Sequence, residues 1–279
     1  MTPASPANTS KPGSEVERLT LRGPSGQDIV ACVQRWGEGP TFIFLHGLVG
    51  LNEHWEDVVD QLADRVSCTT LELPLLELRG ADCSIQGVTE ITESYLDSQN
   101  LAPCVLVGNS FGGHVALRIA RYRPDLVRGL VLAGSSGLIE RTMVKGAPVR
   151  PSREWLREKI GELFHDKSKV SENDIDRAHA ALNSRGGARA MVRLSKTARR
   201  NHLGDELAEI RCPTLLIWGR EDIVTPPSAA QGFMDLLPDA RIAWIDECGH
   251  APMLEAPEVF ARAVRDFADE LDARDRPAS

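Results

Sequence analysis

The sequence has 279 residues, of which 42% are hydrophobic and 26% are charged, and its formal net charge is −8. A chain of this length can bury about three quarters of its unfolded surface around one core, so no second full domain is required. No apolar run approaches the ~20 residues that cross a bilayer. The acidic balance argues against nucleic acid as the main partner, since proteins that bind it usually carry a basic surface.

The cysteines and the composition of the chain ends indicate the cellular compartment. The six cysteines include no Cys-x-x-Cys pair, so neither a zinc site nor a redox pair is indicated. Residues 1–15 are rich in Pro, Ser, Ala and Thr and lack the apolar core of a secretory signal. We therefore expect a reducing, cytoplasmic location, with residues 1–15 and 274–279 as disordered tails.

Alternating or β-branched runs predict eight strands along the chain. They cover residues 16–22, 28–36, 41–45, 66–73, 103–108, 127–133, 213–218 and 241–245. The first two runs have no helix between them, so we expect them to form an antiparallel hairpin at one edge of a sheet.

Helical periodicity follows most of these strands. Apolar residues recur at three- and four-residue steps in 54–65, 88–99, 111–123, 227–237 and 257–271. Alternation of strands and helices implies right-handed crossovers and a mainly parallel sheet covered on both faces. The predicted fold class is therefore α/β.

The alternation stops between residues 138 and 210. Three consecutive helices are predicted there, over 151–164, 171–182 and 187–200, with Ser171 as a helix N-cap and Asp174 as a first-turn acid. This region is expected to lie above the carboxyl edge of the sheet as a helical lid. The alternative is an additional packed helical layer with no gating role. The chain then divides into a first part of the core (16–137), the lid (138–210) and a second part of the core (211–273).

The string Gly-Asn-Ser-Phe-Gly-Gly at residues 108–113 places Ser110 between a strand and a helix. A Gly-x-Ser-x-Gly turn strains the backbone of its middle residue, and the glycines let strand and helix approach without Cβ clashes. The hydroxyl is thereby directed away from the sheet. The string alone is common, but its strand-to-helix setting makes Ser110 a candidate nucleophile.

A serine hydroxyl is a poor nucleophile unless a base lies within hydrogen-bond reach and a third group orients that base. His250 follows the last predicted strand in a loop bounded by Gly and Pro, where open α/β sheets place their sites. Asp222 follows the preceding strand and is the candidate orienting acid, with Glu221 as the alternative. The competing interpretation of Asp222 is a turn aspartate that caps the next helix.

The string His-Gly-Leu-Val-Gly at residues 46–50 directly follows the third strand. Backbone N–H groups held at such a turn can stabilise the oxyanion of acyl transfer, by about 3–4 kcal/mol per donor. Leu48 would supply one donor and Phe111 the second. His46 is expected to hold the turn rather than to act in catalysis.

Together these stretches resemble the α/β-hydrolase superfamily from about residue 16 to residue 271. The chain order Ser110, Asp222, His250 is the order of its catalytic triads. The resemblance implies Ser110 as nucleophile, His250 as general base and then acid, and Asp222 as its partner, with Leu48 and Phe111 as oxyanion donors. It also implies a mostly parallel eight-stranded sheet with a helical lid, a small-molecule substrate and no metal or organic cofactor. The oligomeric state stays open.

Several reactions fit this resemblance. Our leading hypothesis is hydrolysis of a small or medium carboxylic ester through an acyl-enzyme. The serine disfavours haloalkane dehalogenases and epoxide hydrolases, which use an aspartate nucleophile. A non-catalytic ligand-binding protein of the same fold is a further alternative, and a perhydrolase side activity also stays open.

The elbow also resembles those of carbon–carbon hydrolases that cleave meta-ring-fission products. Those enzymes typically place tryptophan after the catalytic histidine, whereas this chain has Ala251. Their acidic substrates would need a basic group in the lid, and Arg185, Arg189 and Arg193 are available.

A second departure concerns the loop after the fourth strand. Many relatives carry Asp-x-x-Gly-x-Gly-x-Ser there, but residues 72–80 read Glu-Leu-Pro-Leu-Leu-Glu-Leu-Arg-Gly. The shape of that side of the pocket is therefore not predicted.

Overall fold

A computed structural model describes residues 15–141 and 150–276. In these ranges, eight strands form one sheet in the order β1-β2-β4-β3-β5-β6-β7-β8. β1 pairs antiparallel with β2, and β2 with β4, while every later pairing is parallel. The predicted edge hairpin and the mainly parallel sheet are both confirmed.

The strands lie where the sequence predicts them, with each boundary within about one residue. They are β1 (Glu17–Arg22), β2 (Asp28–Trp36), β3 (Thr41–Leu45), β4 (Ser67–Glu72), β5 (Cys104–Asn109), β6 (Val127–Ala133), β7 (Thr214–Gly219) and β8 (Ala240–Ile245). Agreement is this close because strands buried on both faces read as short apolar runs bounded by turn residues.

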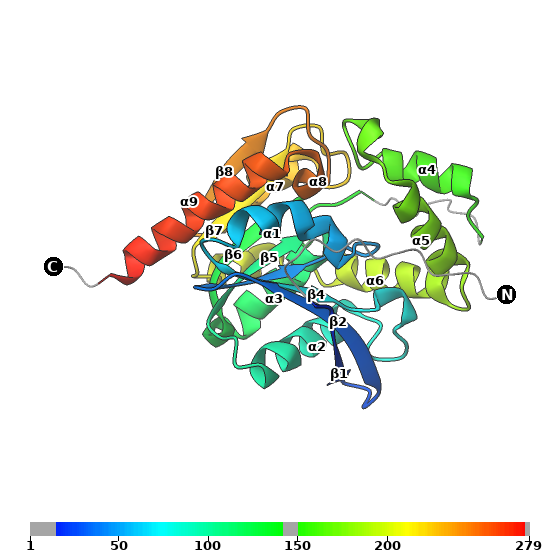
Figure 1. Ribbon diagram of the computed structural model, residues 1–279, viewed down its shortest axis with the longest axis horizontal. Helices are drawn as coiled ribbons and strands as arrows, with labels where there is room; N and C mark the ends of the chain where they lie inside the picture. The colour runs from blue at the N-terminus through cyan, green and yellow to red at the C-terminus, as the bar shows by residue number, and fades with distance from the viewer. Residues whose placement is uncertain (1–14, 142–149, 277–279) are drawn as a thin grey trace.

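Helices cover both faces of the sheet (Figure 1). One face packs against α1 (Glu56–Leu62), α8 (Pro252–Glu255) and α9 (Pro257–Asp275). The opposite face packs against α2 (Ile85–Ser98), α3 (Phe111–Tyr122) and α7 (Pro227–Leu236). Successive side chains of a strand point to opposite faces, so in β5 Val105 and Val107 enter the first core and Leu106 the second.

The C-terminal helix is longer than predicted. A disordered tail was expected from residue 274, but α9 continues to Asp275. Arg274 is held there by ion pairs with Asp239 and Glu270. Most of the expected N-terminal tail, and residues 277–279, lie outside the described residues. Within the described ranges, no helix combines the length and apolar character that a bilayer span requires.

The helical insertion predicted over residues 138–210 lies between β6 and β7, and its residues 142–149 lie outside the described residues. It contains α4 (Arg153–Gly161), α5 (Glu172–Asn183) and α6 (Gly187–Arg200), with the short turns η4 (Lys167–Lys169) and η5 (Gly204–Glu209). Figure 1 shows these three helices together at one side of the molecule. α4 and α5 share a small apolar core built around Leu156, Ile175 and Leu182. Ser171 is the N-cap residue of α5, although its side chain makes no capping hydrogen bond.

The loop after β4, whose shape the sequence does not predict, contacts this insertion. It forms the short turn η2 (Leu75–Glu77), which packs against α6. The Arg79 guanidinium donates to the carbonyl oxygens of Leu76, Leu78 and Arg185. The residues that depart from the common pattern of relatives therefore bind the start of α6 to the core.

Candidate active site

Ser110 occupies a strained turn between β5 and α3. Its φ is 52° and its ψ is −115°, a backbone conformation that residues other than glycine rarely adopt. Its N–H donates to the carbonyl of Ala133 on β6 at 3.1 Å. A Cβ on Gly112 would lie 2.3 Å from the carbonyl oxygen of Leu45. The turn can form only because glycine lets α3 press directly against the end of β3.

His250 and Asp222 meet although 28 residues separate them in the chain. His250 Nδ1 lies 2.8 Å from Asp222 Oδ2, and both side chains are buried. A carboxylate can only accept, so the proton of this hydrogen bond is on Nδ1 and the Nε2 lone pair stays free. The loops after β7 and β8 therefore bring together the two residues that the sequence suggested.

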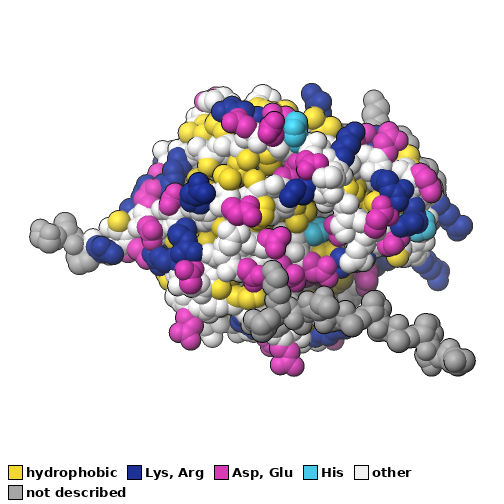
Figure 2. Space-filling view, turned by 45° about the horizontal axis from the view of Figure 1, so that its top comes forward, with side chains coloured by type: hydrophobic (Ala, Val, Ile, Leu, Met, Phe, Trp, Pro, Cys, Tyr) yellow, Lys and Arg dark blue, Asp and Glu magenta, His cyan; other side chains and the backbone are white. Residues whose placement is uncertain are grey.

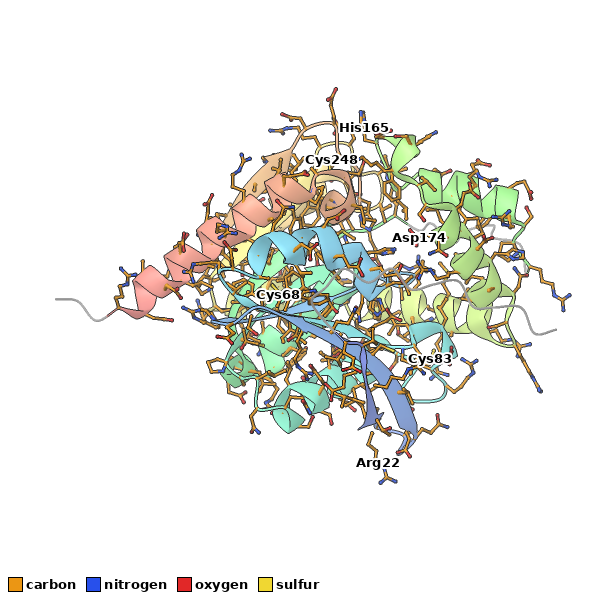
Figure 3. All side chains as sticks on the ribbon, viewed as in Figure 1. Arg22, Cys68, Cys83, His165, Asp174 and Cys248 are labelled. Carbon is orange, nitrogen blue, oxygen red and sulfur yellow. The ribbon has the colours of Figure 1, made fainter. Side chains whose placement is uncertain are left out.

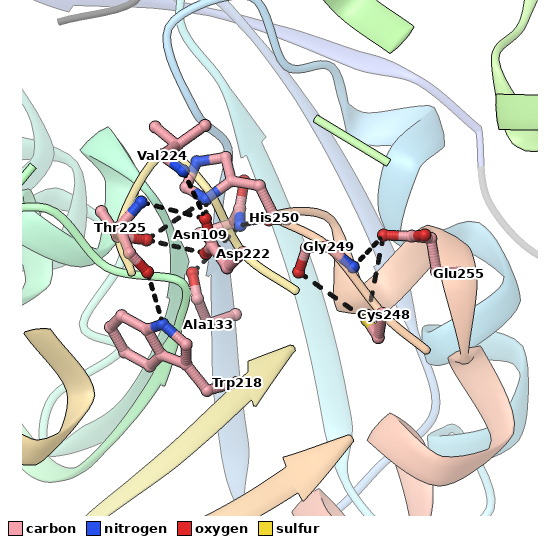
Figure 4. Close-up of polar contacts among 10 residues, drawn as sticks. All are labelled: Asn109, Ala133, Trp218, Asp222, Val224, Thr225, Cys248, Gly249, His250 and Glu255. Carbon is pink, nitrogen blue, oxygen red and sulfur yellow. Dashed lines mark hydrogen bonds and ion pairs between the residues drawn. The ribbon is translucent and has the colours of Figure 1, made fainter. Parts of the chain in front are cut away.

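Asp222 makes both of the interactions that its position suggested. Its Oδ1 accepts the N–H groups of Val224 and Thr225, at 2.8 and 2.9 Å, which fixes the turn before α7. Its Oδ2 accepts the Thr225 hydroxyl at 2.8 Å as well as facing His250. Sequence reasoning missed Thr225, whose hydroxyl lies 3.3 Å from His250 Nδ1. Figure 4 shows this cluster.

Glu221, the alternative acid, has a different contact. One of its carboxylate oxygens accepts the backbone N–H of Cys248 at 2.9 Å. The side chain thus ties the loop after β7 to the loop after β8. Of the two neighbouring acids, Asp222 is the one that the structure places against His250.

Two residues that the sequence did not single out support this pair. Gly134 has a φ of +49°, and a Cβ there would lie 3.0 Å from both Asp222 Oδ2 and His250 Nδ1. The Asn109 amide donates to the carbonyls of Ala133 and His250, at 3.0 and 3.1 Å (Figure 4). The backbone after β6 therefore packs closely against the two side chains, and the Asn109 side chain ties the end of β5 to β6 and to the loop that carries His250.

His46 holds the turn after β3. Its Nε2 accepts the N–H of Leu73 at 3.1 Å, and its Nδ1 lies 2.7 Å from the carbonyl oxygen of Gly47. These contacts match the neutral tautomer with the proton on Nδ1. Burial lowers the pKa of His46, which favours that neutral form. The geometry fits the structural role expected for this residue.

The two expected oxyanion donors lie beside Ser110. A Cβ on Gly47 would lie 3.5 Å from Ser110 Cβ, so the turn that carries Leu48 runs along the serine. Phe111 is the first residue of α3, and the first-turn N–H groups of a helix have no acceptor within the helix. Across the described chain, no residue accepts a hydrogen bond from the Leu48 N–H.

Ser110 and His250 line one cavity of about 830 Å³. Its walls come from the turn after β3, the elbow, the loops after β7 and β8, and all three helices of the insertion. Pockets of about 300–1,000 Å³ hold small organic ligands. Of the three arginines suggested for an acidic substrate, Arg189 and Arg193 line this cavity and Arg185 does not.

Two polar contacts join the core to the insertion beside the cavity. Arg177 of α5 binds Glu53 of the short helix η1 (Asn52–Trp55) at 2.6 Å, and Asp174 lies 3.3 Å from His54 Nε2. Asp174 lies on the side of α5 that faces the core (Figure 3). The hydrogen bond from Arg177 lowers the pKa of Glu53. Burial raises the pKa of Asp174, but its contacts with His54 and Arg177 outweigh this, so the net shift is downward.

These shifts predict that acid loosens α5. Because both pKa values are depressed in the folded protein, the pairs stabilise it above the ordinary values of 4.5 and 3.8, and this contribution is lost as the pH falls through the folded values. We expect amide exchange of α5, corrected for intrinsic rates and compared with α9, to change little between pH 7 and pH 5 and to accelerate about two- to fivefold between pH 5 and pH 3. In Arg177→Gln the exchange should already be fast at pH 7. If the exchange rate of α5 depended on pH equally in wild type and in Arg177→Gln, this prediction would be wrong.

Comparison with known proteins places these features in a family. Residues 42–263 match the model of the Alpha/beta hydrolase family. The chain is 29% identical to a pimeloyl-[acyl-carrier protein] methyl ester esterase of Nitrosomonas europaea, over 82% of this chain and 95% of that protein. It is 30% identical to a 2-hydroxymuconate semialdehyde hydrolase of Pseudomonas putida, over 64% of this chain and 66% of that protein.

A solved structure is similar over most of the chain. It is an alpha/beta hydrolase enzyme from the metagenome of sediments from the Mar Chica lagoon in Morocco, with a TM-score of 0.70 and 29% identity. The match covers 87% of this chain and 96% of that one. With the family model spanning well over half of the sequence, the chain belongs to the alpha/beta hydrolase family.

Proposed function

We propose that this protein is a serine hydrolase that cleaves a small or medium carboxylic ester through an acyl-enzyme on Ser110. The observation that carries the proposal is the cavity that Ser110 and His250 share, with Asp222 2.8 Å behind the histidine. The 29% identity to an esterase over most of both chains supports the same reaction class.

In the acylation step, His250 Nε2 takes the proton of the Ser110 hydroxyl as the serine oxygen attacks the ester carbonyl. A tetrahedral intermediate forms, and its oxyanion is held by the N–H groups of Leu48 and Phe111. The protonated histidine then gives its proton to the departing alcohol, which breaks the carbon–oxygen bond. Water repeats the sequence on the acyl-enzyme and releases the acid.

Asp222 prepares His250 for this proton transfer. Its carboxylate holds the proton on Nδ1, which leaves Nε2 as the base. Its negative charge also stabilises the imidazolium that forms in each step, and the buried setting of the pair strengthens that attraction. The two backbone N–H groups and the Thr225 hydroxyl keep the carboxylate in this orientation.

We also propose that the helical insertion is the lid of this site, between core parts 16–137 and 211–273. Its helices supply much of the cavity wall, including Leu156, Ala178 and Met191. A substrate seated there would be screened from water by α4, α5 and α6. The six cysteines, all free thiols, fit the cytoplasmic location that we propose.

Carbon–carbon bond hydrolysis is the second candidate function. It is favoured by Arg189 and Arg193 on the cavity wall, where they could bind an acidic dienoate, and by the relative from Pseudomonas putida. This reaction predicts that a yellow 2-hydroxy-6-oxo-dienoate decays faster than a matched ester is hydrolysed. The reverse preference favours the esterase.

Labelling with a fluorophosphonate tests the serine mechanism. We expect wild type to take the label and to hydrolyse a 4-nitrophenyl ester, and Ser110→Ala to do neither. Ser195→Ala is the matched control, because Ser195 lines the same cavity and is expected to leave the labelling intact. Label retained by Ser110→Ala would show that Ser110 is not the nucleophile. A wild type that binds ligand but neither labels nor turns over any activated ester would favour the non-catalytic binding protein.

A further inference from the structure

Three cations of α6 form a row at the edge of the cavity. Arg189, Arg193 and Lys196 are exposed, and all three line the cavity. Their spacing of four and three residues places them on one side of the helix. The buried residues Ala190 and Leu194 face the core instead. The row therefore belongs to the opening of the cavity and not to a distant surface.

The arginines and the lysine of α4 and α5 pair with acidic side chains, and the row on α6 differs from them. On α4, Arg153 and Arg157 both pair with Glu172. On α5, Arg177 pairs with Glu53 and Asp174. α6 contains no Asp or Glu at all. None of the three cations in the row has an ion-pair partner among the described residues.

The other charged residues that line the cavity do not balance the positive charge of this row. Lys159 pairs with Glu162, and Asp174 is engaged by Arg177. Arg141 adds one more lining cation, and Glu140 is the remaining lining acid among the described residues. In a chain of net charge −8, a local surplus of positive charge at a pocket opening attracts an anion. Figure 2 shows that acidic and basic side chains are otherwise mixed over the visible face.

Most of the cavity wall is apolar. Met191 and Val192 of α6 lie on the wall, and Leu156 and Ile160 of α4 complete it. Val192 is 52% exposed, so the apolar surface reaches the opening. A ligand that fits this pattern has a reacting end at Ser110, an apolar middle and a charged far end.

We propose that the substrate carries an anionic group at the end remote from the scissile bond, and that Arg189, Arg193 and Lys196 bind it. The inference rests on the proposed ester hydrolysis and names its substrate class: an ester whose acyl chain ends in a carboxylate or a phosphate. Guanidinium groups form bidentate hydrogen bonds with both anions, and the lysine adds a positive charge on a flexible side chain.

A matched pair of substrates tests this. One is the mono-4-nitrophenyl ester of suberic acid, and the other has the free carboxylate replaced by a carboxamide of nearly the same size. We expect wild type to prefer the carboxylate roughly tenfold in kcat/KM, from charge-assisted hydrogen bonds at an exposed site. The preference should shrink as ionic strength rises, because the cations are exposed and screened by salt. A second pair, ending in phosphate or in hydroxyl, shows which anion is preferred.

The triple variant Arg189→Gln/Arg193→Gln/Lys196→Gln should bring the carboxylate-to-amide ratio close to one. Arg185→Gln is the control, since Arg185 lies just before α6 but does not line the cavity, and it should keep the wild-type ratio. Because each variant is compared with itself on two substrates, partial misfolding cancels from the ratio. A wild-type ratio near one, or a preference that survives the triple variant, overturns the inference. If instead no ester of either kind is turned over, the proposed function itself fails.

Discussion

Asp222→Asn is expected to lower kcat for ester hydrolysis by about 10⁴-fold, by analogy with the same change in a serine protease triad. The Val224 and Thr225 N–H groups need an acceptor, so the asparagine oxygen takes the place of Oδ1. The amide nitrogen then faces His250 as a donor. Nδ1 must accept from it, the imidazole proton moves to Nε2, and the base is lost. Steady-state kinetics on a 4-nitrophenyl ester measures the effect.

Glu221→Gln provides the matched control for this prediction. Its carboxylate accepts one backbone N–H, from Cys248, and a glutamine oxygen can accept the same bond. We expect a change in kcat of less than about tenfold, since a neutral acceptor weakens this hydrogen bond by about 1 kcal/mol. If the two variants lost activity equally, the assignment of Asp222 as the orienting acid would be wrong.

The strands and the chain order of the site could be predicted because each depends on local sequence. β5 and β6 are apolar runs in the sequence, and Gly and Pro residues after β5, β7 and β8 indicate turns there. Parallel strands bring their carboxyl ends to one edge of the sheet, so residues after those strands must gather there. That rule predicted the meeting of Asp222 and His250 without any knowledge of side-chain geometry.

What could not be predicted depends on how separate segments pack. Thr225 looks like an ordinary turn residue until the loop closes and its hydroxyl reaches Asp222. Gly134 has no motif around it, and its close approach to His250 exists only in the folded sheet. Similarly, Arg185 and Arg189 carry the same charge and lie four residues apart in the sequence, yet only Arg189 lines the cavity.

Gly112→Ala is expected to destabilise the protein by about 2–3 kcal/mol, although the same change in an exposed helix stabilises by about 1 kcal/mol. The new Cβ would lie 2.3 Å from the carbonyl oxygen of Leu45 and 2.7 Å from that of His46. Both obstacles are backbone, so no side chain can rotate away. β3 and α3 must separate, which also moves the Leu48 turn away from Ser110. Urea denaturation measures the free energy of unfolding, and ester kinetics measures the misalignment.

Gly161→Ala separates this clash from the general effect of removing a helical glycine. Gly161 is the last residue of α4, and a Cβ there meets nothing within 4 Å among the described residues. Alanine should therefore keep or raise stability by up to about 1 kcal/mol, because it reduces the entropy of the unfolded chain. If the free energy of unfolding falls in Gly112→Ala and does not fall in Gly161→Ala, the role of Gly112 is to allow direct contact between α3 and the end of β3. A neutral Gly112→Ala would mean that the elbow can relax, and the tight packing inferred around Ser110 would be wrong.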